Sequence, residues 1–121
     1  MTETLGTRLA SAIAAKDEAA LRGLLAVDVD FKALTPGRTW EGTGPDDVVR
    51  TVFGSWFEPS DEIVAVLAVT DGETVADTSR VSYRFDLANA DGTFVAEQQV
   101  YYRGDAVIDH LRVMCSGFRP R

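Results

Sequence analysis

The sequence predicts one α+β domain shaped like a cone, with N-terminal helices packed on a curved antiparallel sheet of four long strands plus a short one. Apolar residues recur at helical spacing from Leu5 to Leu25 and again over 45–57. After residue 60 the apolar pattern changes to a period of two, which is typical of strands, and turn-forming pairs such as Asp-Gly divide it. The length fits a single domain covering residues 1–121.

Two helices are expected to open the chain. Leu5, Leu9 and Ile13 form one apolar stripe with polar residues between them. Asp17 then offers an N-cap for a second helix, whose buried side lies within 20–25. Each helix therefore has one face that must pack against another element.

A short strand and a third helix should follow. Residues 27–34 alternate between apolar and mainly charged side chains, and the Thr-Pro-Gly sequence at 35–37 supplies a turn. The stretch 45–57 begins with proline and two aspartates, which suit the first turn of a helix. Its apolar face is broad, and Pro59 ends it.

The second half of the chain predicts a four-stranded meander, with strands over 63–70, 74–87, 93–102 and 106–115. Most of these runs exceed the usual strand length of about five or six residues. Long strands joined by tight turns twist, so we expect a curved sheet with a concave face for the helices to cover. The last residues, 118–121, are expected to fray.

Composition and charge exclude several classes of function. Nineteen acidic residues against 12 basic ones give a net charge of −7 with no basic run, so a nucleic-acid partner is not expected. The N-terminus has no signal-peptide pattern, and the longest apolar run, 64–69, is too short to cross a membrane. Cys115 is the only cysteine, which excludes an internal disulfide and suits the cytoplasm. We expect no metal or other cofactor.

The order and lengths of these elements resemble the nuclear transport factor 2-like superfamily over nearly the whole chain. Four segments make its small bacterial SnoaL-like branch the most similar: Phe31 to Gly37, Trp56-Phe57, Glu97-Gln98 and Cys115 to Pro120. The resemblance implies a cystatin-like roll, an apolar pocket inside the cone, and a homodimer through the outer face of the sheet.

Enzymes of this superfamily include ketosteroid isomerases, limonene epoxide hydrolases and SnoaL-type polyketide cyclases, which place carboxylates inside the cone as acid and base. The present sequence departs from that pattern. Ala33 stands near the position of the isomerase general base, and Cys115 stands where many SnoaL-like proteins carry a last-strand aspartate. The resemblance therefore supports the scaffold more strongly than it supports those mechanisms.

The last strand supplies the candidate acid–base residue. Alternation places Asp109, Leu111, Val113 and Cys115 on the inner face and His110 on the outer face, at the surface or in a dimer interface. Asp109 at the pocket rim would be a general acid or base, with Tyr83 or Tyr102 as hydrogen-bond donor. The alternative is that Asp109 lies in solvent.

Candidate ligand-binding residues are the large or polar side chains expected to line the cavity. Aromatic rings in such places are explained equally well by core packing, and a buried cysteine behaves as a small hydrophobe. Inward tyrosine and amide groups can orient a carbonyl or hydroxyl of a ligand. The candidates are Trp40, Phe53, Trp56, Phe85, Gln98, Tyr102, Leu111, Val113 and Cys115.

Three functions fit these features. The first is an enzyme that uses acid–base chemistry of the isomerase, cyclase or hydratase type on a small hydrophobic molecule. The second is a non-catalytic module that binds such a molecule or another protein. The third is a structural dimer whose cavity is closed. The sequence leaves open whether the chain is an enzyme, and an inward titratable side chain would separate the first function from the other two.

Overall fold

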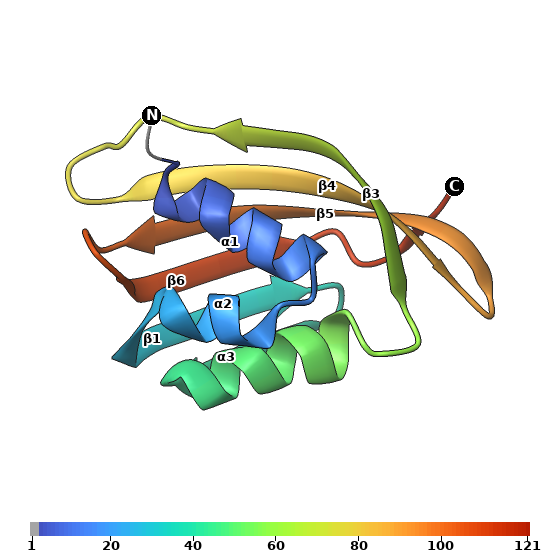
Figure 1. The fold of residues 1–121 in the computed structure, drawn as a ribbon, viewed down its shortest axis with the longest axis horizontal. Helices are drawn as coiled ribbons and strands as arrows, with labels where there is room; N and C mark the ends of the chain where they lie inside the picture. The colour runs from blue at the N-terminus through green and yellow to red at the C-terminus, as the bar shows by residue number, and fades with distance from the viewer. Residues whose placement is uncertain (1–2) are drawn as a thin grey trace.

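The computed structural model describes residues 3–121 and confirms the predicted fold class: helices pack on a curved sheet (Figure 1). No helix among these residues is long and apolar enough to cross a membrane. In chain order the elements are α1 (Leu5–Ala14), α2 (Glu18–Gly23), β1 (Leu25–Thr35), β2 (Arg38–Thr43), α3 (Pro45–Thr51), the π-helical segment η1 (Val52–Trp56), β3 (Glu62–Asp71), β4 (Ser79–Asn89), β5 (Gly92–Arg103), β6 (Ile108–Cys115) and β7 (Arg119–Pro120).

The sheet has the strand order β2-β1-β6-β5-β4-β3, and β7 pairs with β5. The four meander strands pair antiparallel as predicted, whereas β1 and β6 pair in parallel. Two short strands, β2 and β7, were not predicted. The second meander strand begins at Ser79 instead of residue 74, because Ala76 has a positive φ of 56° in the preceding turn.

The helices cover one face of the sheet, and the core lies between the two layers (Figure 1). Gly6 allows α1 to approach the sheet closely, since a Cβ atom at this position would lie 2.8 Å from the Cβ of Val81. The backbone N–H of Gly6 also donates to the hydroxyl of Tyr102, at 3.0 Å. This contact joins the N-terminal turn of α1 to the end of β5.

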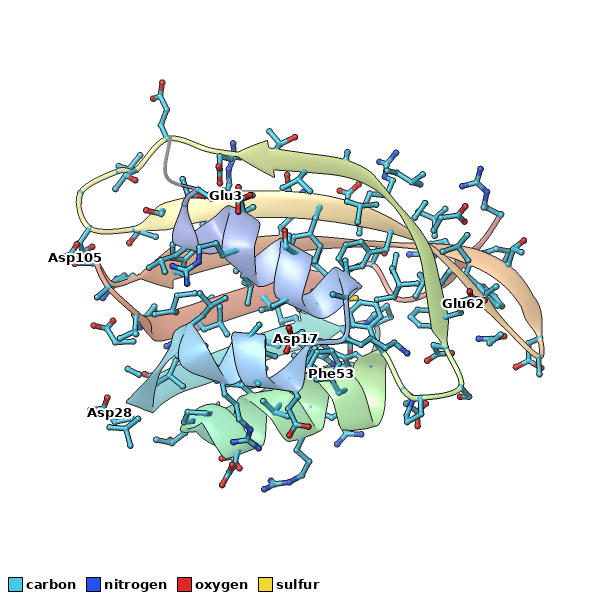
Figure 2. All side chains as sticks on the ribbon, viewed as in Figure 1. Glu3, Asp17, Asp28, Phe53, Glu62 and Asp105 are labelled. Carbon is cyan, nitrogen blue, oxygen red and sulfur yellow. The ribbon has the colours of Figure 1, made fainter. Side chains whose placement is uncertain are left out.

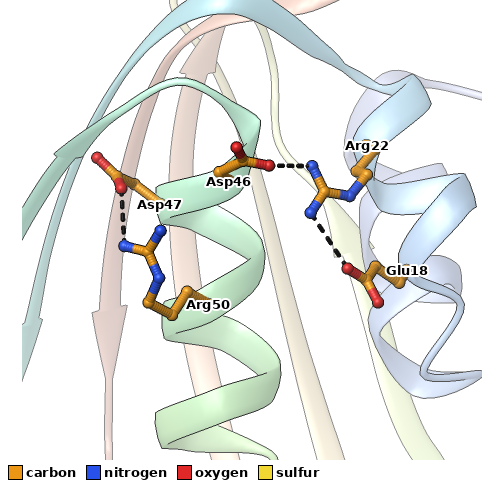
Figure 3. Close-up of polar contacts among 5 residues, drawn as sticks. All are labelled: Glu18, Arg22, Asp46, Asp47 and Arg50. Atoms are coloured by element: carbon orange, nitrogen blue, oxygen red, sulfur yellow. Dashed lines mark hydrogen bonds and ion pairs between the residues drawn. The ribbon is translucent and has the colours of Figure 1, made fainter.

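Short polar side chains begin the first two helices, and ion pairs link the second helix to the third. Asp17 accepts from the N–H of Ala20, as its predicted role as N-cap requires. Arg22 on α2 bridges Glu18 on its own helix and Asp46 on α3 (Figure 3). These pairs are exposed, so they orient the two helices more than they stabilise them.

Asp47 fixes the start of α3 against β2. One of its carboxylate oxygens accepts from the N–H of Thr43 and the other pairs with Arg50, both at 2.9 Å (Figure 3 shows the pair with Arg50). The bond from Thr43 and then the pair with Arg50 hold the pKa of Asp47 below its ordinary value of 3.8. Because the pKa of Asp47 is lower in the folded state, its carboxylate stabilises the fold at pH values above its ordinary pKa. That stability is lost as the pH falls through the folded-state pKa.

We therefore expect Asp47→Asn to lower the free energy of unfolding at about pH 6 and to have a much smaller effect at about pH 2. Urea denaturation at the two pH values measures the difference. Asp28→Asn is the matched control, because Asp28 points away from the body of the molecule (Figure 2) and should show little effect at either pH. An equal loss for Asp47→Asn at both pH values would contradict this role of the carboxylate.

Candidate functional site

A pocket of about 470 Å³ opens where η1, the loop after it and the ends of β1, β4 and β6 meet. This volume falls within the range of small-molecule sites, about 300–1,000 Å³. Aromatic rings form much of its wall, and small polar and acidic groups stand among them. The lining residues are Thr35, Trp40, Ser55, Trp56, Phe57, Glu58, Ser60, Asp61, Asn89, Ala90, Asp91, Cys115, Gly117 and Phe118.

The π-helical turn η1 places Trp56 in the pocket wall. The helix that starts at Pro45 widens at Val52, where the N–H of Phe57 donates to the Val52 carbonyl at 2.7 Å. Gly54 lies within this wider turn and weakens the α-helix. Trp56 is only 8% exposed, and the Nε1 atom of its indole has no hydrogen-bond partner.

Trp40 forms a fixed part of the wall next to Trp56. The two rings meet edge to face, with their centroids 6.0 Å apart. The Nε1 of Trp40 donates to the hydroxyl of Thr35 at 2.8 Å, and the guanidinium of Arg38 lies 3.6 Å from the ring centroid. In contrast to Trp56, the indole N–H of Trp40 is therefore already satisfied.

A row of three polar side chains crosses the inner face of the sheet beside the pocket. Tyr83 on β4 lies opposite Gln98 on β5, which lies opposite Cys115 on β6. Residues directly opposite in an antiparallel pair point to the same face. The hydroxyl of Tyr83 donates to Oε1 of Gln98 at 2.5 Å, whereas Nε2 of Gln98 has no partner. Burial raises the pKa of Tyr83 far above its ordinary value, so the hydroxyl keeps its proton.

Asp61 is a buried carboxylate in the pocket wall and organises the loop after η1. Its two oxygens accept from the N–H of Glu58 at 3.1 Å and from Nδ2 of Asn89 at 2.9 Å. The ammonium of Lys16 donates to the backbone carbonyls of Glu58 and Asp61, which ties this loop to the turn between α1 and α2. Among residues 3–121, no three His, Cys, Asp or Glu side chains are arranged to hold a metal ion.

Phe118 closes the pocket from the C-terminal segment. Its ring stacks on Phe57 with centroids 6.2 Å apart and contacts Phe94 at 5.8 Å. The following residues, Arg119–Pro120, form β7 and pair with β5. The prediction that 118–121 fray was therefore wrong, because two aromatic contacts and a strand pairing hold this segment.

The structure brings together five of the eleven predicted site residues. Trp40, Trp56 and Cys115 line the pocket, and Tyr83 and Gln98 lie beside Cys115 in the buried row. Other candidates lie outside the pocket lining: Phe85, Leu111 and Val113 are buried in the core, Phe53 is half-buried at its edge (Figure 2), and Tyr102 binds Gly6 at the opposite end of the cone.

Asp109 does not reach the pocket rim. Its side chain is exposed, whereas Leu111 and Val113 are buried on the inner face as predicted. Strict alternation fails at the start of β6, since Ile108 and Leu111 are both buried and the pairing with β1 shifts register there. His110, the residue after Asp109, is half-buried, and its pKa is lowered first by burial and then by the nearby arginines. The position of Asp109 gives no support to a catalytic role.

The residues that sequence reasoning missed lie at the ends of elements or in the loops beside them. Asp61 and Asn89 follow elements that the periodicity located, but nothing in their spacing indicates that they meet. Phe57 and Phe118 carried a usable signal, because Phe57 is the last residue of the predicted third helix and Phe118 is an aromatic residue three positions after the last predicted strand. Segments without period give no direction for their side chains, so only the structure places these four in the pocket.

No family model and no curated protein sequence matches the chain. Solved structures do match it. A candidate SnoaL-like polyketide cyclase from Mesorhizobium loti has a TM-score of 0.66 and 14% identity, over 90% of this chain and 94% of that one. A protein from Catenulispora acidiphila with a ketosteroid isomerase-like fold, solved with trimethylamine, has a TM-score of 0.68 and 16% identity, over 93% and 85%. The chain has the SnoaL-like, ketosteroid isomerase-like fold.

The SnoaL-like fold is shared with a third protein, an epoxide hydrolase of the limonene epoxide hydrolase-like type from M. tuberculosis. Its TM-score is 0.65 at 10% identity, over 93% of this chain and 80% of that one. Identities this low establish the SnoaL-like architecture alone, since one fold hosts many unrelated functions. Function must therefore be argued from the pocket itself.

Proposed function

We propose that the chain binds a small hydrophobic molecule in the pocket between Trp56 and Phe118. The unpaired indole N–H of Trp56, buried in the wall of a pocket of ligand size, is the observation that carries this proposal. Ligand sites combine apolar walls with placed polar groups, and this lining sets the rings of Trp40, Trp56, Phe57 and Phe118 among polar and acidic side chains. The trimethylamine bound to the Catenulispora protein supports small-molecule binding by this fold.

Binding is tested by titrating the protein with small cyclic hydrocarbons and ketones while following tryptophan fluorescence. Both tryptophans lie in the pocket wall, so a bound ligand should give a saturable change. Cys115→Phe adds a ring inside the pocket and should abolish the change, whereas Cys115→Ser keeps the size of the side chain and should preserve it. A response that is absent throughout, or unaffected by Cys115→Phe, would refute the proposal.

A second candidate function is acid–base catalysis of the isomerase or cyclase type, which the pocket carboxylate Asp61 favours. A base in this position would exchange the α-protons of a bound ketone. We expect the protein to accelerate deuterium exchange of cyclooctanone in heavy water, and Asp61→Asn to remove the acceleration. Proton NMR follows the exchange, and circular dichroism checks that the variant is folded. If the unaltered protein does not accelerate the exchange, the catalytic proposal fails and only the binding function remains.

We also propose a homodimer through the outer face of the sheet. Leu34, Tyr101 and Met114 lie together there and are 48%, 42% and 54% exposed. Two arginines on this face are paired, Arg112 with Asp30 and Arg84 with Glu97, and the patch is also lined by Lys32 and Glu41. An apolar patch rimmed by charges of both signs suits contact with a second copy.

Light scattering at micromolar concentration tests the dimer. The unaltered protein should have twice the mass of one chain, and Met114→Glu should have the mass of one chain. Val27→Glu is the control, because Val27 is 89% exposed near the start of β1, at the other end of that strand from Leu34. A monomer in the unaltered protein, or a dimer that survives Met114→Glu, would contradict this interface.

A cytosolic location completes the proposal. The thiol of Cys115 lines the pocket and accepts a hydrogen bond from the N–H of Gly117 at 3.4 Å. A reducing compartment keeps such a thiol free and so preserves the shape of the pocket. Fractionation of the native host, with the protein recovered in the membrane or extracellular fraction, would argue against this location.

A further inference from the structure

Two buried side-chain nitrogen atoms of the described residues lack a hydrogen-bond partner, Nε1 of Trp56 and Nε2 of Gln98. Leaving a buried donor unsatisfied costs about 1–3 kcal/mol, and native structures contain few such groups. Trp56 lines the pocket, and Gln98 lies opposite Cys115, which also lines it. The two unpaired nitrogens therefore belong to the same end of the cone.

Both nitrogen atoms are hydrogen-bond donors. An indole N–H can only donate. The phenol of Tyr83 is held neutral by burial and donates a hydrogen bond to Oε1 of Gln98, which leaves the NH₂ group of that amide without a partner. The group that complements both is an acceptor, such as the oxygen of a carbonyl.

The pocket is unsuited to a charged acceptor. Its described lining contains Glu58, Asp61 and Asp91 and has no lysine, arginine or histidine. The nearby ammonium of Lys16 is engaged by the backbone carbonyls of Glu58 and Asp61. A carboxylate entering this site would lose its hydration without gaining a cation and would meet like charges.

We infer that the ligand presents an uncharged acceptor oxygen, as in a ketone, ester or amide, to Nε1 of Trp56 and Nε2 of Gln98, while its apolar body lies against the aromatic wall. The inference rests on the proposed binding function and names the class of its ligand. It also makes Trp56 and Gln98 the residues that select this class over hydrocarbons and carboxylates.

The two indole N–H signals of the protein give a direct test by nitrogen–proton NMR. Cyclooctanone, methylenecyclooctane and cyclooctanecarboxylate share a ring and differ in the group offered to the donors. The ketone should move the Trp56 indole proton downfield and leave that of Trp40, which binds Thr35, nearly unchanged. It should bind about tenfold more tightly than the hydrocarbon, which corresponds to about 1.4 kcal/mol, and more tightly than the carboxylate.

Two variants localise the selectivity. Gln98→Leu and, separately, Trp56→Phe should each reduce the preference for the ketone over the hydrocarbon while the hydrocarbon still binds. Equal affinities for ketone and hydrocarbon in the unaltered protein would overturn the inference and leave the binding function intact. Strongest binding of the carboxylate would also overturn it. If none of the three probes binds, both the inference and the binding function fail.

Discussion

Replacing Phe85 by alanine is expected to lower the free energy of unfolding by about 3–5 kcal/mol. Phe85 is completely buried, its ring stacks on Tyr83 with centroids 4.9 Å apart, and it meets Phe57 edge to face at 5.7 Å. Removing the ring leaves a cavity between the buried polar row and the pocket wall. Urea denaturation followed by circular dichroism measures the loss.

Phe53→Ala is the matched control for this change. Phe53 is also on the core side, but it is only half-buried and makes none of the aromatic contacts that hold Phe57. We expect it to cost about 1 kcal/mol, in line with ordinary substitutions away from the centre of a core. If the two variants lost similar stability, the aromatic cluster behind the pocket would not be the centre of the core.

The regular part of the fold could be predicted because local and long-range signals agree. Asp91-Gly92 joins two strands whose inner residues, such as Phe85 and Ala96, pair directly across the hairpin. Asp17 begins the second helix as expected, and the apolar stripe of Leu9 and Ile13 is buried. Periodicity is reliable where one face of an element is buried and the other is wet.

Such signals could not predict the pairing of β1 with β6 or the presence of β2. A parallel pair joins segments far apart in the chain, so no local turn indicates it. The strand β2 is six residues long and contains Gly42, which is unfavourable in strands. Gly42 is required there, since a Cβ atom would lie 2.6 Å from that of Asp47.

The directions of several site side chains depend on irregular backbone, which alternation does not predict. Gln98 and Cys115 could be placed inward by alternation, and the structure sets them opposite each other. Asp109 was misplaced because the first residues of β6 depart from that alternation. The role of Trp56 depends on a π-turn, whose single extra residue changes the direction of the side chain without altering the apolar pattern. Small changes of register therefore decide which polar groups enter the pocket.

Tyr83→Phe is expected to lower the free energy of unfolding by about 1–3 kcal/mol, because it leaves the buried amide of Gln98 with neither end paired. Gln98→Leu removes the amide and leaves only the hydroxyl of Tyr83 without a partner, so its loss should be smaller. The double variant contains none of these buried polar atoms. Its stability should equal or exceed that of the unaltered protein.

A double-mutant cycle by urea denaturation tests this expectation, with circular dichroism as a check that each variant folds. The double variant should be more stable than the sum of the single losses predicts, by more than the loss of about 1–3 kcal/mol expected for Tyr83→Phe alone. Additive losses would mean that the Tyr83–Gln98 bond does not couple the two side chains. A second result concerns the ligand: the double variant should be stable but should no longer bind cyclooctanone more tightly than methylenecyclooctane. This combination would show that the Gln98 amide destabilises the fold and selects the ligand. Ligand selection would then explain why a half-satisfied polar pair is kept in the core.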